Sequence, residues 1–177
     1  MAQIDDFKAN LIGGGARANQ FRITITPPPG ISIGLDVRRT SFLVTTAGIP
    51  DVAMNFIAVP FRGRNIQYPG DRSDPGDWTT TFYNDTDFMI RNAMERWQNG
   101  INDFVDNTGV IAPADFQTDL QIEQLDRDDT ILKTYILRNC FPTSISAIAL
   151  SSAQADAIET FDVTWKYTHL EASGVNF

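Results

Sequence analysis

The sequence predicts a mainly β fold, a β-sandwich or barrel, with one α-helix packed against it. Short segments in which apolar and polar residues alternate recur along the chain. They amount to about seven or eight strands, separated by turns rich in Gly, Pro and Asp. One segment, residues 86–99, instead has apolar side chains at the helical spacing of three and four. Many short strands with a single amphipathic helix are typical of a closed or stacked sheet that the helix covers.

The length of 177 residues allows one domain with a sizeable core and is short for two. We expect an N-terminal arm over residues 1–19 and a single domain over residues 20–177. In the arm, Ile4, Phe7 and Leu11 lie at helical spacing, but the glycines at 13–15 end any helix there. The arm is either a frayed terminus or a segment that docks on a neighbouring subunit through Phe7 and Leu11.

The first predicted strand is residues 21–25, and the prolines at 27–29 end it because proline cannot donate to a sheet. Further strands are predicted at 41–46 and 55–61. The connection between these two carries Ile49, Val52 and Met54 on what should be an exposed loop. Apolar residues that cluster on a loop are typical of a contact with a partner.

Strands at 65–68 and 79–83 precede the predicted helix. Asp85 and Asp87 suit the positive N-terminal end of that helix, and Gly100 follows where a left-handed C-terminal cap would lie. The apolar stripe that should face the sheet consists of Ile90, Ala93, Met94, Trp97 and Ile101.

The C-terminal part of the chain predicts a hairpin and a closing strand. The hairpin consists of residues 119–125 and 130–137 around an acidic turn, and the closing strand covers residues 159–167. Alternation places Glu123 on the face opposite Leu120 and Ile122. No internal repeat is apparent.

The formal net charge is −8, from 22 acidic and 14 basic residues. A sequence-specific nucleic-acid binder normally has a basic face, which this chain lacks. Acidity either keeps the protein soluble or lines a channel through which DNA slides without sticking.

The sequence predicts neither an enzyme nor a cofactor or metal site. Cys140 and His169 are the only residues of their types, which excludes an intramolecular disulfide and argues against a Cys–His centre. Three sets of aspartates could supply paired carboxylates, but turns and helix starts account for them. They are Asp71, Asp74 and Asp77; Asp85 and Asp87; and Asp126, Asp128 and Asp129.

Neither a membrane-spanning run nor a secretory signal is apparent, which predicts folding in the cytoplasm and no membrane insertion.

Several motifs, in this order and spacing, resemble the tail tube proteins of contractile-tailed (myovirus-type) bacteriophages. The resemblance covers most of the chain and departs from the pattern at residues 27–34, a Pro- and Gly-rich insertion. The motifs are residues 20–25, 47–50, Pro60 with 62–66, 69–72, 78–79, 83–85 with a helix ending near Trp97, 141–145 and 159–167.

The resemblance implies β-sandwich subunits that close into hexameric rings. Such rings stack into a hollow tube inside the contractile sheath, and DNA passes through the tube into the host cell. The implied partners are further copies of the chain, the tail sheath protein, and the baseplate and tail terminator proteins, with DNA in transient, non-specific passage. The protein would be a virion component of the phage tail, assembled in the host cytoplasm, with no catalytic residues.

On this resemblance we expect contacts between rings or subunits in the loop that starts at Gly48 and in the arm. Arg62 and Arg64 would hold Asp71 or an acidic group of a neighbour. The expected contact residues are Phe7, Gly48, Ile49, Pro50, Val52, Met54, Arg62, Arg64 and Asp71, and the expected acidic lumen residues are Glu123 and Asp162.

Two alternatives stay open at this point. The first is the tube of a related contractile injection system: a type VI secretion-like tube, a phage-derived particle or a baseplate tube initiator. The second is a carbohydrate-binding or hydrolytic β-sandwich. Exposure of Trp78 or Trp97 beside paired carboxylates would support the second.

Overall fold

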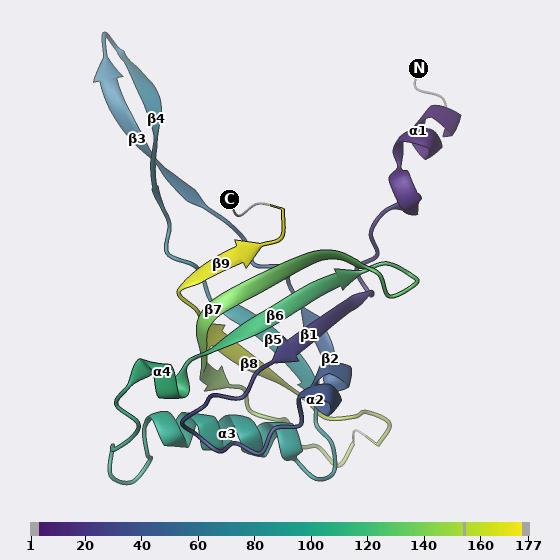
Figure 1. Cartoon of the computed structure of the whole chain (residues 1–177), viewed down its shortest axis with the longest axis vertical. Helices are drawn as coiled ribbons and strands as arrows, with labels where there is room; N and C mark the ends of the chain where they lie inside the picture. The colour runs from purple at the N-terminus through teal and green to yellow at the C-terminus, as the bar shows by residue number, and fades with distance from the viewer. Residues whose placement is uncertain (1–3, 154, 175–177) are drawn as a thin grey trace.

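A curved, antiparallel, seven-stranded sheet forms the body of the protein, and a separate two-stranded hairpin projects from it. The computed structural model describes residues 4–153 and 155–174 (Figure 1). In order, the elements are α1 (Ile4–Asn10), a 3₁₀ turn (Ile12–Gly14), β1 (Phe21–Ile25), α2 (Val37–Leu43), β2 (Val44–Ala47), β3 (Met54–Phe61), β4 (Arg64–Arg72), β5 (Trp78–Tyr83), α3 (Met89–Ile101), α4 (Pro113–Phe116), β6 (Thr118–Leu125), β7 (Ile131–Ile145), β8 (Thr160–Lys166) and β9 (His169–Ala172).

The strand order in the sheet is β1-β6-β7-β8-β5-β2, with β9 also paired to β7. The 15-residue strand β7 joins the two halves, because its first part pairs with β6 and β9 and its last part with β8. Between these parts Asn139 has a positive φ of 57°, a conformation that Asn tolerates better than most residues. Helix α2 packs against β1 and leads directly into β2, so it lies between the two end strands.

The core lies between the sheet and α3, whose predicted apolar stripe faces inward. Trp97 of α3 and Trp165 of β8 are fully buried, and their rings meet edge to face with centroids 5.5 Å apart. The Trp97 indole N–H donates to the carbonyl of Phe116 (2.8 Å), and that of Trp165 donates to the Thr80 hydroxyl (2.9 Å). Burial therefore leaves neither indole donor unpaired. The mainly β fold is confirmed, and α3 is the predicted helix that packs against the sheet, while α2 is a second helix that the sequence did not predict.

Residues 41–46 are not the strand that the sequence predicted. Helix α2 occupies the first part of that segment, and only the short strand β2 follows it. The cause is local capping. The Asp36 carboxylate accepts the N–H of Arg39 (3.1 Å), and the Thr40 hydroxyl donates to the Asp36 carbonyl (2.7 Å).

The predicted helix lies about two to three residues later than expected, at Met89–Ile101. The Asp87 carboxylate does accept the N–H of Met89 (3.1 Å), as a residue at a helix start should. The role predicted for Gly100 was wrong, because this residue lies inside α3 and Asn102 is the C-cap. A Cβ at Gly100 would lie 2.7 Å from the Ile31 side chain, so close packing explains the glycine.

Two segments extend away from the body in the same general direction. The hairpin β3–β4 and the N-terminal segment with α1 both leave the sheet on the side opposite α3 and α4 (Figure 1). Strand β4 is much longer than the predicted segment 65–68. None of the residues in α1 is buried.

Candidate assembly surfaces

The hairpin β3–β4 exposes apolar side chains on both of its faces. Its strands pair from Met54 opposite Arg72 at the base to Phe61 opposite Arg64 at the tip. Arg62 and Gly63 form the turn with φ values of 46° and 82°, and two positive φ angles are what a tight two-residue hairpin turn requires. The exposed apolar residues are Met54, Phe56, Ile57, Val59, Phe61, Ile66 and Tyr68.

Such a hairpin is incomplete as an isolated structure. Phe56 is 70% and Phe61 56% exposed, although consecutive residues of a strand point to opposite faces and one face would normally be covered. Two strands alone are marginally stable in water, and clustered exposed apolar side chains mark a surface that binds another protein. The geometry therefore calls for a partner that covers the hairpin.

The predicted contact loop leads directly into this hairpin. The carbonyl of Gly48 accepts the indole N–H of Trp78 (2.7 Å), which ties the start of the loop to the core. Beyond this anchor Ile49 and Val52 are exposed, Pro50 is half-buried, and Met54 is already the first residue of β3. The loop and the base of the hairpin thus form one continuous exposed apolar surface.

The hairpin separates Arg62 and Arg64 from Asp71, which is one of the two kinds of partner that we expected for them. Arg62 and Arg64 lie at the tip, whereas Asp71 lies near the base beside Arg72, which faces Met54. None of the three forms an ion pair with another among residues 4–153 and 155–174. The prediction that Arg62 or Arg64 pairs with Asp71 of the same chain was therefore wrong. Pairing with an acidic group of a neighbouring subunit stays a prediction. The Arg62 guanidinium lies over the Phe61 ring, 5.4 Å from its centroid.

Phe7 lies on α1 and is exposed, so it contributes no core contact to the subunit.

The two expected lumen residues lie in different surroundings. Glu123 is buried and accepts hydrogen bonds from Arg22 (3.3 Å), its cross-strand partner on β1, and from Gln121 (2.8 Å). Asp162 on β8 is exposed and accepts the hydroxyl of Thr81 (2.6 Å) from β5. Asp162 therefore presents an open carboxylate, whereas Arg22 balances the charge of Glu123.

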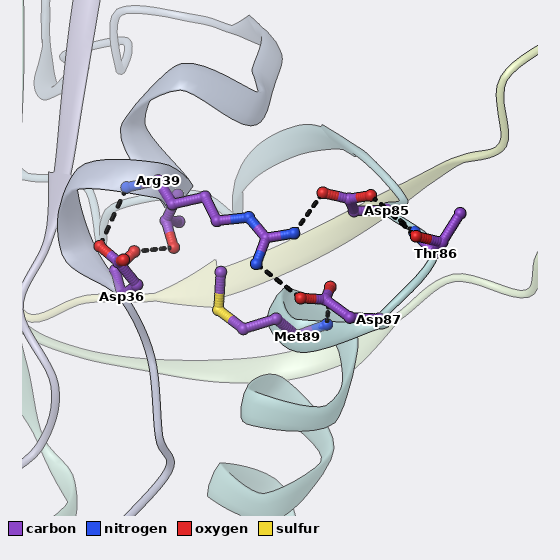
Figure 2. Close-up of polar contacts among 7 residues, drawn as sticks. Asp36, Arg39, Asp85, Thr86, Asp87 and Met89 are labelled. Carbon is purple, nitrogen blue, oxygen red and sulfur yellow. Dashed lines mark hydrogen bonds and ion pairs between the residues drawn. The ribbon is translucent and has the colours of Figure 1, made fainter.

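An arginine that the sequence did not single out holds α2 to the start of α3. Figure 2 shows the Arg39 guanidinium between the carboxylates of Asp85 and Asp87, with 2.5 Å between Nη1 and the Asp87 oxygen. These hydrogen bonds hold the pKa of both aspartates below its usual value. The sequence suggested helix-start roles for the two aspartates, and a partner more than forty residues away left no local signal.

The described side chains offer little for catalysis. Within residues 4–153 and 155–174 no group of three His, Cys, Asp or Glu side chains could hold a metal ion. Burial raises the pKa of the Cys140 thiol to about 12, so the thiol is protonated and unreactive at neutral pH. Trp78 and Trp97 are both buried, which removes the exposed aromatic platform that a carbohydrate site would need.

Across the described ranges, no helix has the length and apolar character needed to cross a membrane.

A β-structured body with a satisfied core and an uncovered apolar hairpin defines a subunit that is completed by assembly with other chains. The chain belongs to the phage tail tube protein family, whose model matches residues 16–172. It is therefore a structural subunit of a phage tail tube, as the resemblance to contractile-tailed phages predicted.

Individual relatives agree with this assignment. The tail tube protein of Serratia phage KSP90 is 28% identical over 169 residues, covering 94% of this chain and 95% of that protein. Tail tube protein gp19 of Enterobacteria phage T4 is 27% identical over 153 residues, covering 86% and 88%. Among solved structures, a chain of the sheath–tube complex of an extracellular contractile injection system has a similar fold, with a TM-score of 0.58, 16% identity and coverage of 95% and 97%.

Proposed function

We propose that six copies of the chain close into a ring and that such rings stack into a hollow tube within a contractile sheath. The exposed apolar hairpin is the observation that supports stacking most directly, because only another chain can cover it. Sheet edges support ring closure: within the described part of the chain, β2 pairs only with β5 and has a free edge.

The domain, residues 20–177, forms the tube wall, and the arm, residues 1–19, reaches a neighbouring subunit through Phe7. The loop from Gly48 through Ile49, Pro50 and Val52 to Met54 adds to the stacking contact. Arg62 and Arg64 at the hairpin tip meet an acidic group of the next subunit. Apolar burial and strand pairing dominate the assembly energy, because an isolated surface ion pair contributes only about 0–1 kcal/mol.

The tube conducts DNA into the host cell by a mechanical and electrostatic mechanism, without catalysis. A wall built from chains of net charge −8 repels the phosphate backbone and keeps DNA from adhering. Asp162 is the better of the two lumen candidates, because its carboxylate is open whereas Glu123 is paired with Arg22. The tail sheath, baseplate and tail terminator proteins are the expected partners in the virion, and assembly takes place in the host cytoplasm.

The test is electron microscopy of the concentrated protein, with Ile49→Asp and Ile49→Leu compared against wild type. We expect wild type and Ile49→Leu to form hollow tubes or six-fold rings. Ile49→Asp should fold as a monomer but fail to grow tubes, because it places a charge in the apolar contact. The proposal is contradicted if the wild-type chain stays monomeric at high concentration and also fails to assemble when sheared phage tails are added as seeds.

A further inference from the structure

The loop between α3 and α4, residues 102–112, is held in one conformation by its own hydrogen bonds. The Asp103 carboxylate accepts the N–H groups of Val105 (2.8 Å) and Asp106 (3.3 Å) and the amide of Asn99 (3.0 Å). The backbone N–H of Val105 contributes most to lowering the pKa of Asp103. At Gly109 a Cβ would lie 2.0 Å from the carbonyl oxygen of Ile101, so the backbone there packs too closely for any side chain.

This ordered loop displays apolar side chains to solvent. Phe104 is 81%, Val105 85% and Ile111 94% exposed. Beside them a hollow of about 440 Å³ opens between the loop, the end of α3 and residues 141–143 of β7. A loop fixed by so many hydrogen bonds cannot collapse to cover these side chains, so they form a second preformed apolar surface.

The loop and the hairpin have opposite charges. Residues 102–112 contain Asp103 and Asp106 and no Lys or Arg, which gives −2. Residues 54–72 contain three arginines and one aspartate, which gives +2 in a chain whose total is −8. Both surfaces also expose apolar side chains. The two surfaces are therefore complementary, because their charges attract and their apolar side chains can cover one another.

The two surfaces also lie at opposite ends of the molecule. The hairpin projects from one end of the long axis, and α3, α4 and the loop between them lie at the other (Figure 1). They cannot meet within one chain. A contact between them is head to tail, and such a contact repeats from copy to copy along an axis instead of closing as a dimer.

We propose that the α3–α4 loop of one subunit receives the tip of the β3–β4 hairpin of a second copy in the adjacent ring. Arg62 and Arg64 lie beside Asp106, and Phe61 packs against Phe104 and Val105. The inference rests on the proposed stacking of rings and identifies the surface that the hairpin contacts.

Cross-linking through introduced cysteines tests this contact, and Cys140 does not interfere because it is buried. The full-length variant with both Arg64→Cys and Asp106→Cys is assembled under reducing conditions, checked for tubes by electron microscopy, and treated with a short bismaleimide. If the tip of each subunit lies on the loop of the next, denaturing gels show a ladder that extends beyond dimers. Each single variant has one accessible cysteine, because Cys140 is buried, and runs as a monomer on the gel, since like positions do not meet.

The matched control pairs Arg64→Cys with Leu150→Cys, which lies on a different exposed apolar loop and should give no ladder. Two results overturn the inference and leave the proposed function standing. The first is that the Arg64–Asp106 variant forms intact tubes but gives no ladder. The second is that the Leu150 control gives a ladder and the Arg64–Asp106 variant does not. Absence of tubes from wild type under the same conditions contradicts the proposed function and the inference with it.

Discussion

Truncation of Phe56 to alanine separates the stability of the subunit from the stability of the tube. The side chain is 70% exposed in the subunit, so its loss removes little apolar packing from the monomer. We expect the free energy of unfolding of the monomer to change by no more than about 0.5 kcal/mol, as at an ordinary surface position. The proposed stacking covers this side chain in the tube, so we expect the substitution to act almost entirely on assembly.

The expected effect on assembly follows from the exposed area. A Phe side chain buries roughly 150–250 Å² when fully covered. The 70% that is still exposed on Phe56 corresponds to about 140 Å² at the middle of this range. At about 25 cal/mol per Å² this area contributes about 3.5 kcal/mol, which is an upper value because association also has costs. Since each 1.4 kcal/mol is about tenfold in an equilibrium constant, this upper value corresponds to a rise in the critical concentration of up to about 300-fold.

The assay is sedimentation of assembled tubes over a concentration series, with denaturant unfolding of the monomer in parallel. Phe56→Leu keeps most of the apolar area and should give an intermediate critical concentration. A Phe56→Ala chain that assembles within about threefold of the wild-type concentration would refute the view that this hairpin face is covered in the tube, because about 0.65 kcal/mol is too little for a buried aromatic side chain.

Two further predictions concern the subunit itself. Gly109→Ala should lower the free energy of unfolding by roughly 1–3 kcal/mol, because the new Cβ meets the Ile101 carbonyl. The neighbouring control is Thr108→Ala at an exposed position, and equal denaturant midpoints for both variants would contradict the close approach at Gly109. Arg39→Gln should destabilise the subunit at neutral pH, and the difference from wild type should shrink as pH falls. Because Arg39 lowers the folded-state pKa of Asp85 and Asp87, its contribution is complete above their ordinary pKa near about 3.9 and is lost as pH drops through the lower folded values. Denaturant unfolding over an acid pH series measures this, and a pH-independent difference would rule out ion pairing as the cause.

The ion pairs that sequence patterns did not predict join residues that are distant in the sequence. The alternation of Phe161, Val163 and Trp165 was sufficient to predict β8, because a strand with one buried face has a period of two. Asp85, by contrast, has its charged partner on α2, and Glu123 is balanced by Arg22 about 100 residues away. No pattern within a strand or helix contains those pairs, so only the folded chain could identify them.

The segment of β3, residues 54–61, illustrates the division between sequence and structure. Its run of apolar residues predicts a strand, which is a local consequence of side-chain chemistry. In the subunit the same residues are exposed on both faces, because the turn at Arg62 and Gly63 pairs the strand with β4 alone, away from the sheet. The sequence by itself determined most of the strands, the helix α3 and the apolar residues that need to be buried, but not the helix α2, which replaces part of a predicted strand. Only the tertiary structure decided which of these residues are buried within one subunit and which remain for contacts between subunits, because burial depends on how distant segments pack together.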